Sequence, residues 1–194
     1  IVFLLFFLFS GIRMDGWFSG KVSAHEKGKR RALLIGNSDY SNSGIADPVT
    51  SINDIEAVSD TLVQFYGYER DDILLIKNGS KEEILKGLYT LGRQTRSEDT
   101  VLIYYAGHGE FDEYGIGWWI PVGAEANYDY ISNQEVILRI KTIPAHSVLL
   151  ISDSCFSGSF EEYAAGKDPD EGTSDRGGES SPSHIQVIAS GGNA

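Results

Sequence analysis

Short apolar runs that alternate with helix-like segments constrain the fold of this chain more than any other feature of its sequence. Runs rich in β-branched and aromatic residues predict buried strands. They occupy residues 31–36, 72–77, 100–105, 147–152 and 185–189. Apolar residues at helical spacing predict helices over 51–66, from Ser80 to about Leu91, and over 133–140. Because strands that alternate with helices are joined by crossovers, we expect an α/β fold with a mainly parallel central sheet flanked by helices.

His108 and Cys155 carry the strongest functional signal in the sequence. His108 follows the predicted strand 100–105, and Cys155, the only cysteine, follows the predicted strand 147–152. Since the carboxyl ends of parallel strands share one edge of a sheet, both residues are expected on one rim. Whether the two strands are neighbours does not follow from the sequence. An imidazole can take the proton of a thiol and later protonate a leaving amine, so the pair predicts a cysteine hydrolase.

Backbone amides beside the pair are candidate donors for an oxyanion. Gly107 and Gly109 flank His108, so the backbone can approach a substrate closely there. The amides of Gly109 and Cys155 are the predicted donors, and one such donor can contribute about 3 kcal/mol to the transition state.

Packing roles compete with this hypothesis. A lone cysteine is usually a small buried hydrophobe, and a lone histidine is usually structural. The combination of His108 and Cys155 in glycine-rich turns after buried strands favours a catalytic role for the two residues. His146 is expected to be structural, and His25 and His184 to be solvated. The sequence contains no dinucleotide-binding glycine motif, no serine nucleophile elbow and no phosphate-binding loop.

Composition limits the remaining classes of function. The 194 residues suffice for one domain with a core, and the formal net charge of −12 argues against a general nucleic-acid binder. A single cysteine excludes an intramolecular disulfide, and the sequence shows no zinc-type cluster. We therefore expect no metal and no organic cofactor.

The two ends of the chain differ in composition from its middle. Residues 1–24 begin with an apolar run that is too short to span a bilayer and fits a signal-peptide core or an anchor remnant. Alternatively, Met14 is the true start. A real leader implies a secreted, periplasmic or membrane-anchored protein, and otherwise the protein is cytoplasmic. Residues 25–194 form the predicted domain, which looks truncated at its C-terminus. Within it, residues 161–184 form a predicted flexible acidic loop.

At these residues the sequence resembles the caspase-like cysteine peptidases, and within them the bacterial relatives of metacaspases. The likeness spans about residues 30–194 in the family order. The matching segments are residues 32–37, 51–55, 104–110, 119–122, 151–158 and 189–191. The resemblance implies a caspase-like three-layer sandwich, a dyad of Cys155 and His108, and protein or peptide substrates.

The resemblance also implies an S1 pocket that carries acidic residues. Asp153 matches the metacaspase residue two positions before the cysteine that helps bind a basic side chain, and Asp54 matches a second acidic residue. The competing interpretation of Asp54 is a helix-face carboxylate. Cleavage is thus expected after Arg or Lys and not after Asp, with Arg favoured because a carboxylate can bind a guanidinium through two hydrogen bonds.

The sequence departs from the metacaspase pattern at two places. Phe156 stands where many members have histidine, and Ser132 with Asn133 replaces the Asp pair of calcium-dependent members. Because calcium prefers charged oxygen ligands, we expect weak calcium dependence or none. The carboxylates that could still bind calcium are those of Asp129, Glu161 and Glu162.

Lys167 and Arg176 lie in the acidic segment that matches the processing loop of the family. Under basic specificity they are candidate sites of self-cleavage. Two alternatives to a peptidase remain open: an inactive caspase-like scaffold or regulatory module, and a hydrolase of some non-peptide amide.

Overall fold

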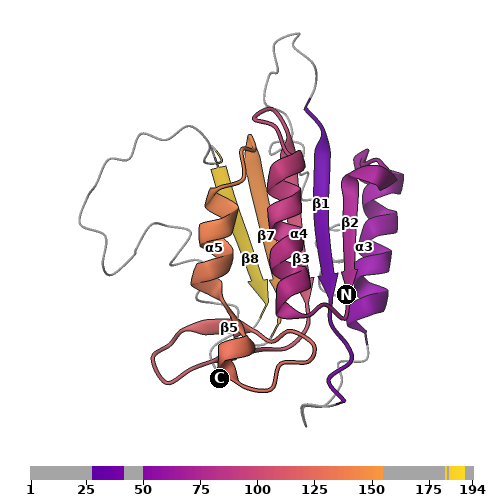
Figure 1. Ribbon diagram of the computed structural model, residues 1–194. Helices are drawn as coiled ribbons and strands as arrows, with labels where there is room; N and C mark the ends of the chain where they lie inside the picture. Colours follow the sequence, from indigo (N-terminus) through magenta and orange to yellow (C-terminus); the bar gives the residue numbers. More distant parts are fainter. Residues whose placement is uncertain (1–27, 42–49, 155–181, 183, 191–194) are drawn as a thin grey trace, which may run out of the picture.

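A parallel sheet forms the centre of the molecule. The computed structural model describes residues 28–41, 50–154, 182 and 184–190. Within them the main sheet has the strand order β2-β1-β3-β7-β8, and each neighbouring pair is parallel (Figure 1). Its strands are β1 (Arg30–Gly36), β2 (Ile73–Lys77), β3 (Thr100–Ala106), β7 (Ser147–Asp153) and β8 (His184–Ser190). β1, β3 and β7 therefore lie inside the sheet and β2 and β8 at its edges.

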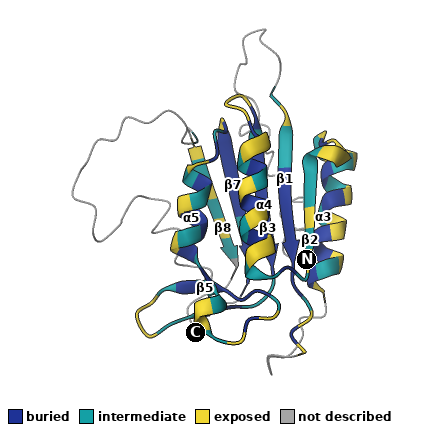
Figure 2. Cartoon of the chain, viewed as in Figure 1, coloured by how far each residue is buried: buried dark blue, intermediate teal, exposed yellow. Residues whose placement is uncertain are grey.

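Helices cover both faces of this sheet and complete three layers. α3 (Ser51–Tyr66) packs on one face, where Ile55 and Leu62 join a cluster with Leu34 and Tyr104. α4 (Lys81–Gln94) and α5 (Asn133–Lys141) pack on the other. Figure 2 shows buried residues along the strands and on the helix faces turned toward them. The predicted mainly parallel sheet flanked by helices is confirmed.

A small antiparallel sheet lies below the carboxyl ends of the main strands (Figure 1). It consists of β4 (Gly109–Phe111), β5 (Gly117–Trp119) and β6 (Ile131–Ser132), with β5 in the middle. Short 3-10 turns occupy Arg70–Asp72 (η1) and Asn127–Asp129 (η2). The sequence predicted only one extended element near this place, at residues 118–122. Strands of two or three residues are too short to show a period, which explains why the second sheet was missed.

The predicted helix and strand boundaries agree closely with the structure. α4 begins after Ser80 as the capping-box pattern predicted, because the Ser80 N–H donates to Glu83 Oε2 and the Glu83 N–H donates to Ser80 Oγ. β8 begins at His184 instead of residue 185, so the last residue of the predicted acidic loop pairs with Ser147 in the sheet. In the described part of the chain, no helix is both long and apolar enough to span a membrane.

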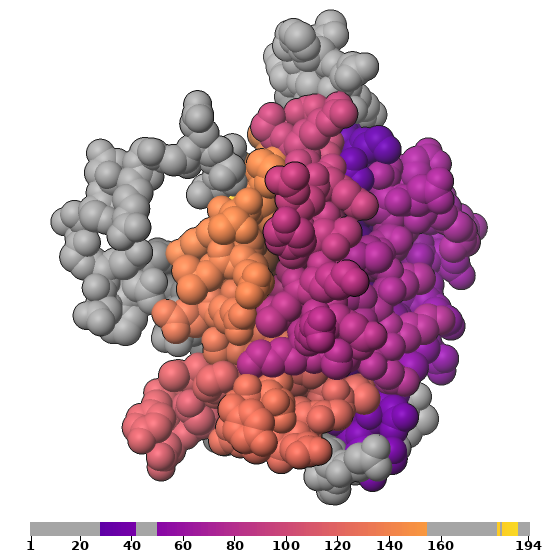
Figure 3. All heavy atoms as spheres, in the orientation of Figure 1, coloured from indigo at the N-terminus to yellow at the C-terminus, as the bar shows by residue number. Residues whose placement is uncertain are grey.

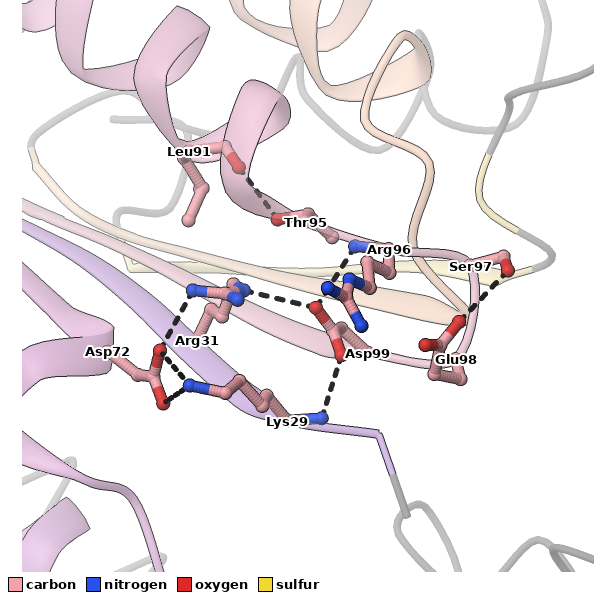
Figure 4. A network of polar contacts seen from close by, with 9 residues as sticks. All are labelled: Lys29, Arg31, Asp72, Leu91, Thr95, Arg96, Ser97, Glu98 and Asp99. Carbon is pink, nitrogen blue, oxygen red and sulfur yellow. Dashed lines mark hydrogen bonds and ion pairs between the residues drawn. The ribbon is translucent and has the colours of Figure 1, made fainter. Parts of the chain in front are cut away.

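A partly buried network of ion pairs connects the amino ends of β1, β2 and β3 (Figure 4). Arg31, near the start of β1, donates from Nε to Asp99 Oδ2 at 3.0 Å and from Nη1 to Asp72 Oδ1 at 2.8 Å. Lys29 reaches the same two carboxylates, with its Nζ 3.0 Å from Asp72 Oδ2 and its backbone N 2.7 Å from Asp99 Oδ1. This network lies at the amino ends of the strands, whereas His108 lies beyond their carboxyl ends.

Candidate active site

The carboxyl ends of β3 and β7 lie side by side. The two strands are parallel neighbours, and Ala106 is the register partner of Asp153. The Gly107 N–H donates to the Asp153 carbonyl at 3.4 Å. The loop with His108 and the residue Ser154 therefore leave the sheet at the same rim. This answers the question that the sequence left open about the two strands.

Two tyrosines hold the backbone of His108. The His108 N–H donates to the Tyr40 hydroxyl at 3.1 Å, and that hydroxyl donates to the Ile120 carbonyl at 2.9 Å. The Tyr40 and His108 rings meet edge to face, with centroids 4.6 Å apart. On the other side, the Tyr105 hydroxyl lies 2.7 Å from the His108 carbonyl oxygen. Burial raises the pKa of Tyr105, so this phenol stays protonated and can donate.

Gly107 is required by the close approach of these tyrosines. A Cβ at this position would lie 2.8 Å from the Tyr105 hydroxyl oxygen and 3.1 Å from that of Tyr40. A side chain would therefore displace the groups that hold the backbone of His108.

Gly109 begins β4 and presents its N–H at the edge of the small sheet. The Ile120 N–H donates to the His108 carbonyl, so Gly109 and Trp119 form a non-hydrogen-bonded pair of the antiparallel ladder. In such a pair the N–H of each residue points away from the partner strand. The Gly109 N–H is thus directed away from β5.

Two carboxylates and a phenol gather on the α3 side of the rim. Asp54, on the first turn of α3, is 4% exposed, and Asp153 ends β7. Burial raises the pKa of the Asp54 carboxyl, a hydrogen bond from the Thr50 side chain lowers it, and the charge of Asp153 raises it. The Tyr104 hydroxyl lies 3.4 Å from Asp153 Oδ2, and burial followed by the charges of Asp153 and Asp54 raises its pKa.

One oxygen of this acidic group has no donor in the part of the chain that the structure describes. Among the described residues, the buried Oδ1 of Asp54 has no hydrogen-bond partner. A buried carboxylate oxygen without a donor is costly, so the group favours a ligand that brings positive charge and N–H donors.

Comparison with known proteins decides the family. A family model described as the caspase domain matches residues 29–190. The chain belongs to the caspase-domain family. The same residues therefore carry the fold, the two aligned strand ends and the acidic group.

Curated relatives of this caspase domain include fungal metacaspases. Metacaspase-1 of Pyricularia oryzae is 28% identical over 150 residues, which cover 68% of this chain and 37% of the relative. Metacaspase-1 of Ajellomyces capsulatus is 30% identical over 149 residues, which cover 68% and 41%. The chain thus spans well under half the length of these relatives. Since they are fungal, the likeness to bacterial members stays a prediction.

A solved structure supports the fold alone. Protein GSU0716 from Geobacter sulfurreducens superposes with a TM-score of 0.54 at 17% identity, over 72% of this chain and 55% of the other. At this identity the comparison bears on architecture and not on the site.

Several predicted residues of the caspase domain lie outside the described residues. They are Cys155, Phe156, Glu161, Glu162, Lys167, Arg176 and His25. Their predicted roles stay predictions. His146 and His184 are both exposed, and His146 contributes a backbone N–H to the Asp99 carbonyl.

The described residues contain no group of three or more His, Cys, Asp or Glu side chains placed to hold a metal ion. Ser132 caps α5 by accepting from the Glu135 N–H at 3.0 Å, and Asp129 Oδ2 accepts from the Glu125 N–H at 3.1 Å. Both residues therefore have local roles, and the weak calcium dependence stays a prediction.

Sequence reasoning missed the tyrosines of this rim. Tyr104 and Tyr105 are consecutive on β3, and alternation along a strand sends one to each face of the sheet. That alternation was a usable signal. The position of Tyr40 beside His108 was not, because the two are 68 residues apart in sequence.

Proposed function

We propose that this caspase domain is a cysteine endopeptidase with Cys155 as nucleophile and His108 as general base and acid. The adjacent, register-matched ends of β3 and β7 support the pairing, because His108 and the residue before Cys155 leave the sheet at one rim. Family membership supports the class of reaction.

The proposed reaction uses groups of this chain alone. His108 takes the thiol proton of Cys155, and the sulfur attacks the carbonyl carbon of the scissile bond. The N–H groups of Gly109 and Cys155 stabilise the resulting oxyanion. The intermediate collapses as the C–N bond breaks, and His108 protonates the leaving amine. Water, activated by His108, then hydrolyses the thioester and releases the thiol.

Recognition of a basic side chain is proposed for Asp54 and Asp153. The observation that carries this proposal is the buried carboxylate of Asp54 near the charge of Asp153. Its Oδ1 has no hydrogen-bond partner within the described part of the chain. A guanidinium would supply the missing donors and relieve the repulsion between the two acids. Substrates with Arg before the scissile bond are therefore preferred over those with Lys, and Asp is rejected.

A panel of fluorogenic peptides that differ only in the residue before the scissile bond tests this proposal. We expect turnover with Arg, weaker turnover with Lys and none with Asp, and Cys155→Ala should abolish all of it. Asp153→Asn should lower kcat/KM for Arg by about tenfold or more, as expected for loss of a charge-assisted contact. Preference for Asp would refute the assignment of the pocket. A chain that cleaves nothing and does not react at Cys155 with an Arg-directed thiol probe would favour the scaffold alternative.

Self-cleavage at Lys167 or Arg176 is a second consequence of basic specificity. Intact mass after incubation should show fragments that end at these residues, and Cys155→Ala should remain whole. Addition of calcium at micromolar concentration should change the rate little, and a large saturable activation would contradict the predicted weak dependence.

A further inference from the structure

A buried set of contacts lies behind the rim, on the face of the sheet opposite the acidic group. Tyr105 and Ser152 are register partners on β3 and β7. Tyr105 belongs to the core cluster of the α4 and α5 side, whereas Tyr104 belongs to that of the α3 side. Trp119, from β5 of the small sheet, is fully buried in the same cluster as Tyr105. Its ring stacks on that of Tyr105, with centroids 4.2 Å apart and planes 8° from parallel.

Trp119 also makes a polar contact in this dry environment. Its Nε1 donates to Ser152 Oγ at 3.0 Å, and Ser152 Oγ lies 3.1 Å from Ser154 Oγ. An indole N–H can only donate, so the Ser152 oxygen accepts from it. Ser152 is fully buried and Ser154 is 6% exposed. Because a buried polar group that loses its partner destabilises the fold, this geometry is tightly specified.

These contacts run from one predicted catalytic loop to the other. The Tyr105 hydroxyl lies 2.7 Å from the His108 carbonyl oxygen, and Ser154 directly precedes Cys155 in the sequence. We call Tyr105, Trp119, Ser152 and Ser154 the tryptophan bridge. Simple packing would require only a ring of this size, whereas the indole N–H and the two hydroxyls add a directional connection between β5 and the end of β7.

We propose that Trp119 is a positioning residue, which sets the Ser154 backbone relative to the His108 backbone so that thiol and imidazole meet. The inference rests on the proposed function, because it assumes that Cys155 and His108 react together. Trp119 lies behind the sheet rim and is fully buried, so it offers no surface to a substrate. Its loss should therefore affect the chemical step and the ionisation of the thiol more than binding.

Trp119→Phe and Ser152→Ala each remove the polar contact, and Trp118→Phe is the matched control. Trp118 neighbours Trp119 in β5, and its Nε1 donates at 3.2 Å to Asp112 Oδ2, within the β4–β5 segment. We expect Trp119→Phe and Ser152→Ala to lower kcat about tenfold to 100-fold, with little change in KM, because small misplacements of reacting groups are costly. Trp118→Phe should leave kcat within about twofold of the parent. The double variant Trp119→Phe/Ser152→Ala should lose no more than the worse single one, because both remove the same hydrogen bond.

The pH dependence of alkylation separates positioning from stability. A nearby imidazolium stabilises a thiolate, so a loosened pair should shift the alkylation of Cys155 by iodoacetamide toward higher pH, nearer the free thiol value of about 8.5. The shift should appear in Trp119→Phe at temperatures where its circular dichroism shows it fully folded, and not in Trp118→Phe. An unchanged alkylation profile and kcat in folded Trp119→Phe would overturn the proposal, as would losses that occur only where the variant unfolds.

These readouts keep the two hypotheses apart. Alkylation requires no turnover, so the bridge can be tested even on a chain that cleaves no peptide. If the parent and Cys155→Ala show the same lack of cleavage while Trp119→Phe still shifts the alkylation profile, the proposed peptidase fails and the bridge stands. In ¹⁵N–¹H spectra, Ser152→Ala should move the indole signal of one of the three tryptophans and speed its exchange with solvent. An unmoved signal would refute the hydrogen bond itself.

Discussion

Asp54 shows how a single buried carboxylate can cost stability and serve recognition. Its pKa is raised by burial and by Asp153, so the proton is held more tightly in the folded than in the unfolded chain. The stability from this preference is present below the ordinary pKa of an aspartate and is lost as pH rises through the folded value. We predict that Asp54→Asn raises Tm by about 3 °C at pH 8, a change of roughly 1 kcal/mol, and that the gain shrinks toward pH 4. The same variant should lose activity on Arg peptides. Thermal melts across this pH range check the prediction, and a Tm below that of the parent at pH 8 would contradict it.

α4 owes its start to a local capping box, whereas its position depends on the core. Ser80 and Glu83 satisfy each other's backbone N–H groups. The hydrogen bond from the Ser80 backbone lowers the pKa of Glu83. The stability that this bond gives to the helix start is therefore lost as pH falls through the lowered pKa. We predict that Ser80→Ala lowers the free energy of unfolding by about 1 kcal/mol in urea titrations. Ser97→Ala is the control, because the Ser97 Oγ donates to an exposed neighbour, Glu98. This substitution should change the free energy of unfolding by less than about 0.5 kcal/mol. Equal effects of the two substitutions would show that the cap is dispensable.

The three layers hold together because elements distant in sequence are connected at both ends of the main strands. At the amino ends of the strands, the network around Arg31 joins β1, the turn before β2 and the turn before β3 (Figure 4). The Asp99 side chain in this network is 2% exposed. The buried carboxylate of Asp99 accepts hydrogen bonds from Lys29, Arg31 and Arg96, and an amide would replace one accepting oxygen by a donor. Asp99→Asn should therefore lower the free energy of unfolding by about 3 kcal/mol. Disruption of the exposed pair of Arg70 and Asp60 by Asp60→Asn should cost less than about 1 kcal/mol. Urea denaturation of both variants decides this, and similar losses would refute the special role of the network.

The space-filling view shows segments distant in sequence side by side on one surface (Figure 3). α4 forms a continuous surface with α5 and the segment of the small sheet, although β3, a strand of the main sheet, separates α4 from them in sequence. The small sheet meets the main one through Trp119, whose side chain is fully buried. The rim that carries His108 is therefore built from both sheets.

Much of the architecture and several site residues were predictable from local sequence. Each main strand is a continuous apolar run because both of its faces are covered, and each helix carries a stripe of apolar residues or a cap signal of its own. These properties depend on neighbouring residues and survive without knowledge of the fold. His108, Gly109 and Asp153 were likewise placed at strand ends by their distance from apolar runs.

The order of the strands, the face of the sheet that each helix covers and the contacts between side chains could not be predicted from the sequence. They depend on pairings between distant residues. Nothing in the crossover pattern states that β3 and β7 are neighbours or that Ala106 aligns with Asp153. Asp54 meets the charge of Asp153 only because α3 covers that face, and Trp119 reaches Ser152 only because the small sheet folds under the rim. Local sequence therefore determines which segments are strands and helices, whereas long-range packing determines which side chains meet.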